Sequence, residues 1–440
     1  MNRIILIGNG FDLAHGLKTS YANFIDWYWN EWGRLLLNSL NFSEEDGLCR
    51  FELNYHVSRI WSGIVWDCRS EGYLSAIEPF DGHVVVDYIK SHPEKCSFSY
   101  ESPLLEELCK QLEERKWVDI ENVFFRHLSN NHEKPEKVNA ELSVIRKRLI
   151  DYLTEVQKSA SDVGVKDDLR KKMLAPFNKR DVAISSKDMW VEMLEQRVNY
   201  LGKDWEQLIY AYLQGDNYHY MSSDVYNFLS DNSEKIRKEG IWKLEDNDIP
   251  EGFLLPDRIL LLNFNYTNTA DQYLPHVDRF RVNHIHGDLA KPESVIFGYG
   301  DEIDENYKKI SDKNDNEYLK NIKSIKYLES PNYRNLLDFI ESDTYQVFIM
   351  GHSCGNSDRT LLNTLFEHKN CVSIKPFYYI RKDGTDNYME LVQNISRNFT
   401  DMKLMRDRVV NKTFCEPYSD AREKISYCAD TPEGAKLHLP

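Results

Sequence analysis

The chain has 440 residues, 41% of them hydrophobic and 29% charged, which suits a folded protein of two or three domains or one core with a large insertion. Its formal net charge of −16, without a long Lys/Arg block, disfavours general binding to DNA or RNA, because such binding depends on neutralising phosphates. We expect a cytoplasmic protein without membrane contact, since the first apolar run is too short for a signal peptide and no run approaches about 18 apolar residues.

The chain opens with a pattern typical of a nucleotide-binding turn. A buried strand is predicted at Ile4–Ile7, and it runs directly into Gly8, Asn9 and Gly10 before a predicted helix. Backbone N–H groups at such a turn can face an anion. The dinucleotide fingerprint G-x-G-x-x-G is not matched, because the next glycine after Gly10 is Gly16. A nucleotide held here is therefore expected to be gripped differently from the cofactor of an ordinary dehydrogenase.

From about residue 20 to residue 255 the apolar spacing predicts mainly helices. Thr19-Ser20 and Ser102-Pro103 have the composition of helix N-termini. Further apolar stripes at helical spacing cover 142–156, 190–198 and 205–213.

Strand signals return near residue 256 and alternate with turns and a helix. Strands are expected at 258–263, 282–286, 294–299, 345–350 and 372–380, with a helix at 360–366. This alternation predicts a parallel sheet with helices on both faces. We therefore expect an α/β fold whose core comprises 1–35 and 255–440, split by an all-helical insertion at 36–254. The highly charged segment 301–320 is expected to face solvent.

Polar residues follow four of the predicted strands. These segments are 8–12 (GNGFD), 263–267 (NFNYT), 284–288 (HIHGD) and 351–353 (GHS). Ligands of open parallel sheets bind beyond the carboxyl ends of the strands. The four segments together therefore indicate a candidate site.

Two of these regions carry a family resemblance. The stretches ILIGNGFDLAHGLKTSYANF and FIMGHSCGNSDRTLL resemble the AbiH family of bacterial abortive-infection proteins. More remotely, GNGFD, NFNYT, HIHG and GHS occur in the order of the landmarks of the sirtuin-like NAD-binding fold. The resemblance implies a sirtuin-like Rossmann core and an antiphage effector that hydrolyses NAD when infection is sensed. It also implies a homo-oligomer, kept inhibited until a phage-derived trigger or partner protein acts.

The same resemblance implies roles for individual residues. Asn265 would position the nicotinamide ribose or an attacking water, and His286 would be the general base. NAD, as the substrate, would contact Gly8, Asn9, Gly10, Phe11, Asp12, Tyr266, Gly351, His352, Ser353 and Asp358. Asp12 stands where the sirtuin-like loop usually has a serine, and Thr267 replaces the usual acidic residue. The zinc-binding cysteines of deacetylating sirtuins are absent, which argues against deacetylation.

Two other functions stay open from the sequence. The chain could be a non-catalytic module that senses a nucleotide or binds a partner through its insertion. It could also be a metal-dependent hydrolase, because His284 and His286 would share one face of a strand, with Asp288, Asp301 or His352 completing the sphere. With no second histidine cluster in the chain, we expect no metal. Asp119 and Glu121 could reach the cleft from a helix or serve only as its cap.

Overall fold

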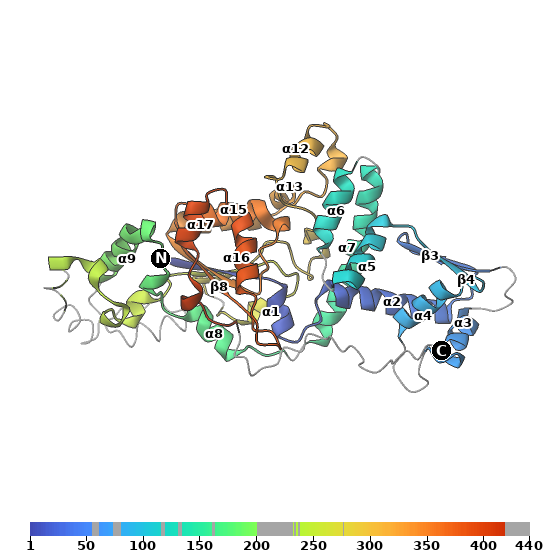
Figure 1. Ribbon diagram of the computed structural model, residues 1–440. Coiled ribbons are helices and arrows are strands. Elements are labelled where there is room, and N and C mark those ends of the chain that lie inside the picture. Colours follow the sequence, from blue (N-terminus) through green and yellow to red (C-terminus); the bar gives the residue numbers. More distant parts are fainter. Residues whose placement is uncertain are drawn as a thin grey trace.

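The structure is a computed structural model, and it describes residues 1–418 except for 55–60, 74–80, 116–118, 131–133, 161–162, 200–231, 233–234, 236–237 and 276 (Figure 1). The helix predicted at 205–213 lies outside the described residues. Within them, no helix is both long and apolar enough to span a bilayer.

Five parallel strands form the central sheet. They are β1 (Asn2–Ile7), β5 (Ile259–Asn263), β6 (Phe280–His284), β7 (Tyr345–Met350) and β8 (Cys371–Phe377). Their spatial order is β6-β5-β1-β7-β8, and every neighbouring pair is parallel. Numbered among themselves, these strands run 3-2-1-4-5, the order of doubly wound, Rossmann-type sheets. The prediction of a parallel α/β core is confirmed.

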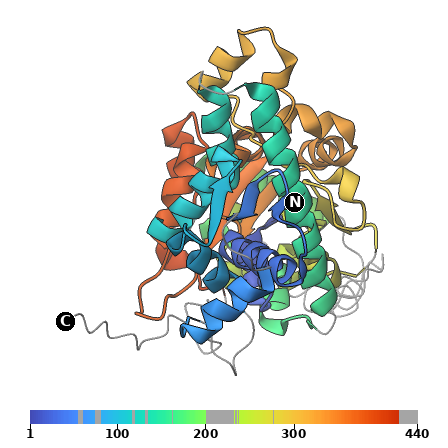
Figure 2. The same cartoon turned by 90° about the vertical axis from the view of Figure 1, so that its right-hand side faces the viewer.

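Both faces of this sheet are covered, which is why its strands read as continuous apolar runs. Ile4 and Leu6 of β1 face a core built with α14 (Asn332–Ser342), α15 (Arg359–Glu367), α16 (Tyr388–Arg397) and α17 (Met402–Arg408). Ile5 and Ile7 point the other way, toward α1 (Asn9–Ala14) and α8 (Asp167–Leu174). Figures 1 and 2 show the strands between these groups of helices.

The first part of the inserted chain lies to one side of the sheet (Figure 1). The helices here are α2 (Tyr21–Asn38), most of which precedes the predicted start of the insertion at residue 36, and α3 (Trp61–Ser70), α4 (Gly82–Ser91), α5 (Pro103–Arg115), α6 (Ile120–Ser129) and α7 (Pro135–Ser159). Ser20 Oγ accepts the backbone N–H of Asn23, and Ser102 Oγ accepts that of Leu105, so both predicted caps are confirmed.

The prediction of an all-helical insertion is wrong. Three antiparallel strands, β2 (Ser43–Glu45), β3 (Cys49–Leu53) and β4 (Cys96–Tyr100), form a second sheet. In β3 the side chains of Cys49, Phe51 and Leu53 are buried while Arg50 is exposed. This alternation is the strand signal, but it spans only five residues and is interrupted by polar side chains.

The second part of the inserted chain packs against the opposite side of the core, as the position of α9 (Lys187–Asn199) shows in Figure 1. Phe177 and Trp190 share an apolar cluster with Met1 at the start of β1 and Val372 of β8. Lys375 Nζ pairs with Asp181 Oδ2 at 2.8 Å. The insertion is therefore distributed over two places on the core.

Short helices complete the chain. They are α12 (Glu305–Ser311), α13 (Lys323–Lys326) and the 3-10 turns η1 (Lys179–Asp181), η2 (Ile184–Ser186), η3 (Ile241–Lys243), η4 (Asp246–Asp248), η5 (Glu251–Leu254), η6 (Thr269–Gln272), η7 (Pro292–Ser294), η8 (Asn316–Tyr318), η9 (Tyr327–Glu329), η10 (Asn356–Asp358) and η11 (Lys412–Phe414).

The strand predicted at 294–299 is absent from the central sheet, so that prediction is wrong. The N–H of Ile296 donates to the carbonyl of His286, and the N–H of Tyr299 donates to that of Asn321. The segment is apolar because it is covered by loops, and loop carbonyls satisfy its backbone in place of a neighbouring strand.

Candidate functional site at the carboxyl ends of the strands

Two strand-end loops meet where the strand order reverses, between β1 and β7. The N–H of Gly10 donates to the carbonyl of Gly351 at 2.9 Å. A Cβ atom on Gly8 would lie 2.6 Å from Cα of His352, and one on Gly10 would lie 2.9 Å from Cα of Gly351. Glycine is therefore required at both positions by the close approach of the two backbones. In doubly wound sheets this switch point is where a ligand crevice forms.

The loop after β5 is tied to the same place. Nδ2 of Asn265 donates to the carbonyl of Gly8 at 3.0 Å, and its backbone N–H donates to Oδ1 of Asn263 at 3.0 Å. The half-buried Asn265 side chain is thus held beside the glycine turn. The structure brings these predicted site residues together.

Asp12 is buried behind this loop rather than exposed on it. Thr267 Oγ1 donates to Asp12 Oδ2 at 2.6 Å, while Oδ1 has no hydrogen-bond partner. Burial raises the pKa of the Asp12 carboxyl to about 6, although the hydrogen bond from Thr267 opposes the shift. Asp12 and Thr267, the two departures from the sirtuin-like pattern, therefore bond to each other.

A cluster of buried ionisable side chains lies beside these loops. His286 Nε2 is 3.2 Å from Asp358 Oδ1, and Lys323 Nζ is 2.8 Å from the same oxygen. Lys323 also reaches Glu121 Oε2 of α6 at 2.7 Å. One ammonium group therefore bridges two carboxylates that come from distant parts of the chain. We call Glu121, His286, Lys323, His352 and Asp358 the buried cluster.

His352 joins the cluster from the loop after β7. Its Nδ1 accepts the backbone N–H of Cys354 at 3.0 Å, which leaves the proton on Nε2, 3.7 Å from Asp358 Oδ2. Cys354 itself has φ of 54°, an unusual value for a residue with a side chain. The structure around this loop therefore holds a strained backbone, a feature common at functional sites.

The pKa values of the two carboxyl groups in the cluster are shifted in opposite directions. Burial and the charge of Asp358 raise the pKa of Glu121 to about 7 despite the nearby Lys323. Burial acts in the same direction on Asp358, but Lys323 and His286 outweigh it and hold the pKa of Asp358 well below its usual range. When the pKa values of two neighbouring carboxyl groups are separated in this way, one group can be ionised and the other can act as a proton donor at neutral pH.

His286 is set up as a neutral base. Burial and the charge of Lys323 lower the pKa of its imidazole, although Asp358 opposes them. Because Asp358 is ionised, the proton of the ring belongs on Nε2, facing that carboxylate. Nδ1 makes no hydrogen bond with a described residue. Tyr327 stacks on the ring with its hydroxyl 3.2 Å from Nε2, and Phe264 packs edge-on.

The remaining predicted contacts are spread around this centre. Asn9 Oδ1 accepts the hydroxyl of Thr19, and Ser353 is exposed at the rim. Phe11 is fully buried and packs against His15 and Tyr273 in the core. Tyr266 lies at the other edge of the site, where its hydroxyl donates to the carbonyl of Ile296 at 3.1 Å.

Sequence reasoning missed Lys323 and Tyr327, and named Glu121 only as an open choice. Lys323 is 1% exposed, yet it follows a highly charged segment where a lysine is normally solvated. The weak signal was the mixture of apolar and charged residues in NIKSIKYL. Asp119 caps α6 by accepting the N–H of Asn122 at 3.1 Å. Its Oδ2 nevertheless faces Gly355, 3.8 Å from where a Cβ would be.

The metal-hydrolase alternative gains no support from the histidine pair. His284 Nε2 contacts Asp271 Oδ1 at 2.9 Å, whereas His286 turns toward Asp358, so the two rings do not converge. Among the described residues, no group of three or more His, Cys, Asp or Glu side chains is placed to hold a metal ion.

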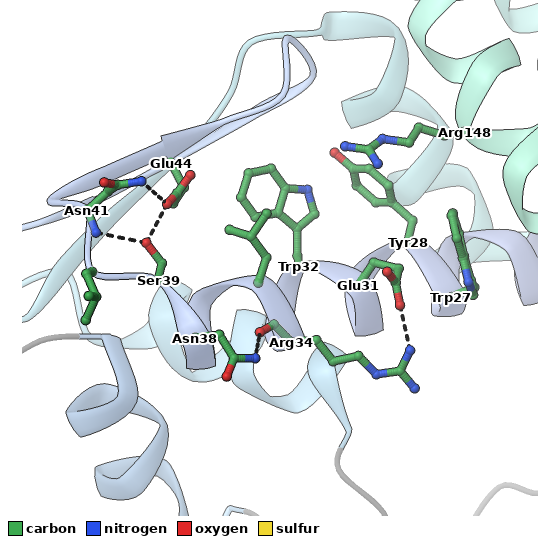
Figure 3. A pocket seen from close by; sticks show the side chains of 12 residues that line it. Trp27, Tyr28, Glu31, Trp32, Arg34, Asn38, Ser39, Asn41, Glu44 and Arg148 are labelled. Carbon is green, nitrogen blue, oxygen red and sulfur yellow. Dashed lines mark hydrogen bonds and ion pairs between the residues drawn. The ribbon is translucent and has the colours of Figure 1, made fainter.

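A separate cavity of about 560 Å³ belongs to the insertion (Figure 3). It runs along α2, with Trp27 and Trp32 on its wall and Arg148 contributed by α7. Its charged groups are already paired, as the contact between Arg34 and Glu31 in Figure 3 illustrates. Nothing in this cavity connects it with the strand ends.

The fold and the site define an α/β protein with a doubly wound sheet and a buried cluster of charged side chains at its switch point. The chain belongs to the family described as bacteriophage abortive infection AbiH, whose model matches residues 4–379. The family identified from the sequence is thereby confirmed. No curated protein and no solved structure matches the chain.

Proposed function

We propose that this protein is an abortive-infection effector that hydrolyses the nicotinamide–ribose bond of NAD. Membership in an abortive-infection family supports the defence role. The observation that best supports the chemistry is the His286–Asp358 pair at the carboxyl ends of a doubly wound sheet. This pair supplies a neutral imidazole that is held by a carboxylate. It lies at the edge of the sheet where ligands of doubly wound folds bind.

In the proposed reaction, His286 Nδ1 takes a proton from water as the water oxygen bonds to C1′ of the nicotinamide ribose. The C1′–N bond breaks, and its electron pair returns to the ring nitrogen, so nicotinamide leaves neutral. Asp358 holds the imidazole by its Nε2–H and stabilises the imidazolium that forms. Asn265, anchored to the carbonyl of Gly8, orients the ribose or the water.

The charge of the cluster suits this reaction better than phosphoryl transfer. In the part of the chain that the structure describes, Lys323 is the ammonium group bound to Glu121 and Asp358, and the carboxyl group of Asp119 also interacts with the charges of Lys323 and Asp358. The surroundings are therefore neutral to negative, which stabilises an oxocarbenium-like transition state. Cleavage of a phosphate ester would instead require an excess of cations.

Regulation follows from the same proposal. An NADase that was always active would kill its own cell, so the resting protein is inhibited in the cytoplasm. A phage-derived trigger or partner releases it, with assembly into a homo-oligomer as the control.

The test is nicotinamide release from NAD by the purified full chain, with and without phage lysate. We expect His286→Ala and Asn265→Ala each to reduce release at least about 100-fold, the scale of losing a general base or a positioning contact. His368→Ala is the matched control, because His368 pairs with Glu341 and stacks on Tyr345 at the opposite ends of the strands.

Two results would overturn the proposal: no release under any condition, or equal release by the wild type and both variants. Tight binding of NAD without turnover would instead favour the non-catalytic sensing module.

A further inference from the structure

A second cavity, of about 470 Å³, lies along the edge strand β6. Its walls come from the chain after β5, from β6 itself, from the loop after β6 and from α7. The lining residues are Gln157, Tyr266, Asn268, Asp271, Leu274, Pro275, Phe280, Val282, His284, Asp288, Leu289 and Ala290. The volume is in the range of pockets that hold small organic ligands.

The charged groups on this wall are carboxylates. The lining contains Asp271 and Asp288, and no lysine or arginine is among these twelve described residues. Asp271 uses Oδ1 to accept from His284 Nε2, and Asp288 uses Oδ1 to accept the N–H of Ala290 at 2.8 Å. The second oxygen of each carboxylate makes no hydrogen bond with a described residue.

His284 is oriented by contacts at both of its ring nitrogens. Nδ2 of Asn263 donates to the carbonyl of Thr267 at 3.1 Å and lies 3.3 Å from His284 Nδ1. Since an amide nitrogen can only donate, Nδ1 accepts this contact, and Nε2 donates to Asp271 Oδ1. His284 therefore occupies one oxygen of Asp271, and the other oxygen stays available to a ligand in the cavity.

Apolar side chains line the same cavity. They belong to Leu274, Pro275, Phe280, Val282 and Leu289. A cavity that combines two carboxylates with five apolar side chains matches an organic cation with a weakly hydrated body. A phosphate or a carboxylate ligand would meet like charge.

Tyr266 and the segment from His284 to His286 relate the cavity to the buried cluster. Tyr266 lines it, and the same phenol senses the charges of Glu121 and Lys323. The segment from His284 to His286 spans both places, with His284 on the cavity wall and His286 in the cluster.

We propose that this cavity binds a cationic N-heteroaromatic ring. Resting on the proposed function, we assign it as the subsite for the pyridinium end of the substrate. It would then discriminate nicotinamide nucleotides from nucleotides whose base is neutral.

The test measures binding of three ring probes to the full chain by titration calorimetry, without NAD. The probes are 1-methylnicotinamide (a cation), nicotinamide (neutral) and nicotinate (an anion). We expect the cation to bind tightest and the anion weakest. The double variant Asp271→Asn/Asp288→Asn should weaken binding of the cation at least about tenfold, as expected for two partly screened charges, and change that of nicotinamide less than about twofold.

These substitutions keep shape and hydrogen bonds, since an amide oxygen still accepts from His284 and from the N–H of Ala290. Glu293→Gln removes an exposed carboxylate of the neighbouring turn and should leave binding unchanged. Ala290→Trp places a bulky side chain on the exposed rim and should weaken all three probes.

Equal affinity for the three probes, or a double variant that binds the cation normally, would overturn the subsite. Charge-dependent ring binding without NAD cleavage would support the subsite while refuting the proposed function. Cleavage of NAD with no such binding would refute the subsite alone.

Discussion

Asp12 lies in a buried position where ionisation of its carboxyl group destabilises the folded protein. It is 1% exposed, and one of its carboxylate oxygens has no hydrogen-bond partner. Its pKa of about 6 in the folded protein lies above the value of 3.8 for an unperturbed aspartate. Between these two values the folded state binds more protons than the unfolded state, so stability falls as the pH rises through this window.

We therefore expect Asp12→Asn to stabilise the protein at high pH, because an amide oxygen still accepts from Thr267 and carries no charge. The gain in unfolding free energy should be near zero below about pH 4 and reach about 3 kcal/mol above about pH 7. Urea unfolding of both proteins at pH 4, 5, 6 and 8 measures it. If the gain in unfolding free energy is the same at every pH, ionisation of Asp12 does not destabilise the folded protein.

The candidate site shows how far single residues can be predicted. Asn265 and His352 follow fully buried strands, and a polar residue after an apolar run marks the carboxyl edge of a sheet. His286 follows the edge strand β6, which is only partly buried. Glu121 and Lys323 sit in charged surroundings in the sequence, where solvent exposure is the ordinary outcome. Only the packing of α6 on the core makes them partners, and one sequence does not contain that contact.

At the level of elements, burial decides which strands the sequence reveals. The strand at 345–350 was predicted with its observed bounds because both of its faces are buried. The strands β3 and β4 were missed, since each is a short alternating segment with one polar face. The run at 294–299 is apolar because loops cover it. Its sequence therefore resembles that of a strand, although it is not part of the central sheet.

The glycine turn after β1 gives a prediction at the same scale. A Cβ on Gly8 would meet three atoms of Gly351 and His352 within 2.9 Å, two of them backbone atoms that cannot rotate away. We expect Gly8→Ala to reduce stability by about 1–3 kcal/mol, the usual cost of overpacking. Thermal unfolding measures the loss. Gly164→Ala is the control, because a Cβ there meets nothing within 4 Å.

This experiment also separates two roles of the turn. If Gly8 served only to admit a phosphate group, Gly8→Ala would weaken nucleotide binding and leave the unfolding temperature unchanged. A loss of stability shows that the contact between the loops after β1 and β7 is itself a structural requirement.

On the scale of the whole molecule, Lys323 links the insertion to the core through two ion pairs. Its ammonium group contacts Glu121 of α6 in the insertion and Asp358 in the turn that follows β7. The apolar cluster around α2–α7 also includes Phe297, Tyr299 and Ile322 from the core side. Because both polar and apolar contacts cross this boundary, we expect the inserted helices around α6 and the sheet to unfold together.

The variant Lys323→Met tests how much this link stabilises the protein. The variant removes a buried cation and leaves the carboxylates of Glu121 and Asp358 without their partner, which should cost about 3–5 kcal/mol. Lys326→Met is the matched control, because Lys326 pairs with Glu329 at the surface and its loss should cost less than about 1 kcal/mol.

Calorimetry should give one transition for the wild type and one, at lower temperature, for Lys323→Met. Adding Glu121→Gln should recover little of the loss, because Glu121, whose pKa is already about 7 beside Lys323, takes up a proton once that cation is gone. Two separate transitions in the wild type, or equal effects of the two lysine variants, would contradict a cluster that joins insertion and core.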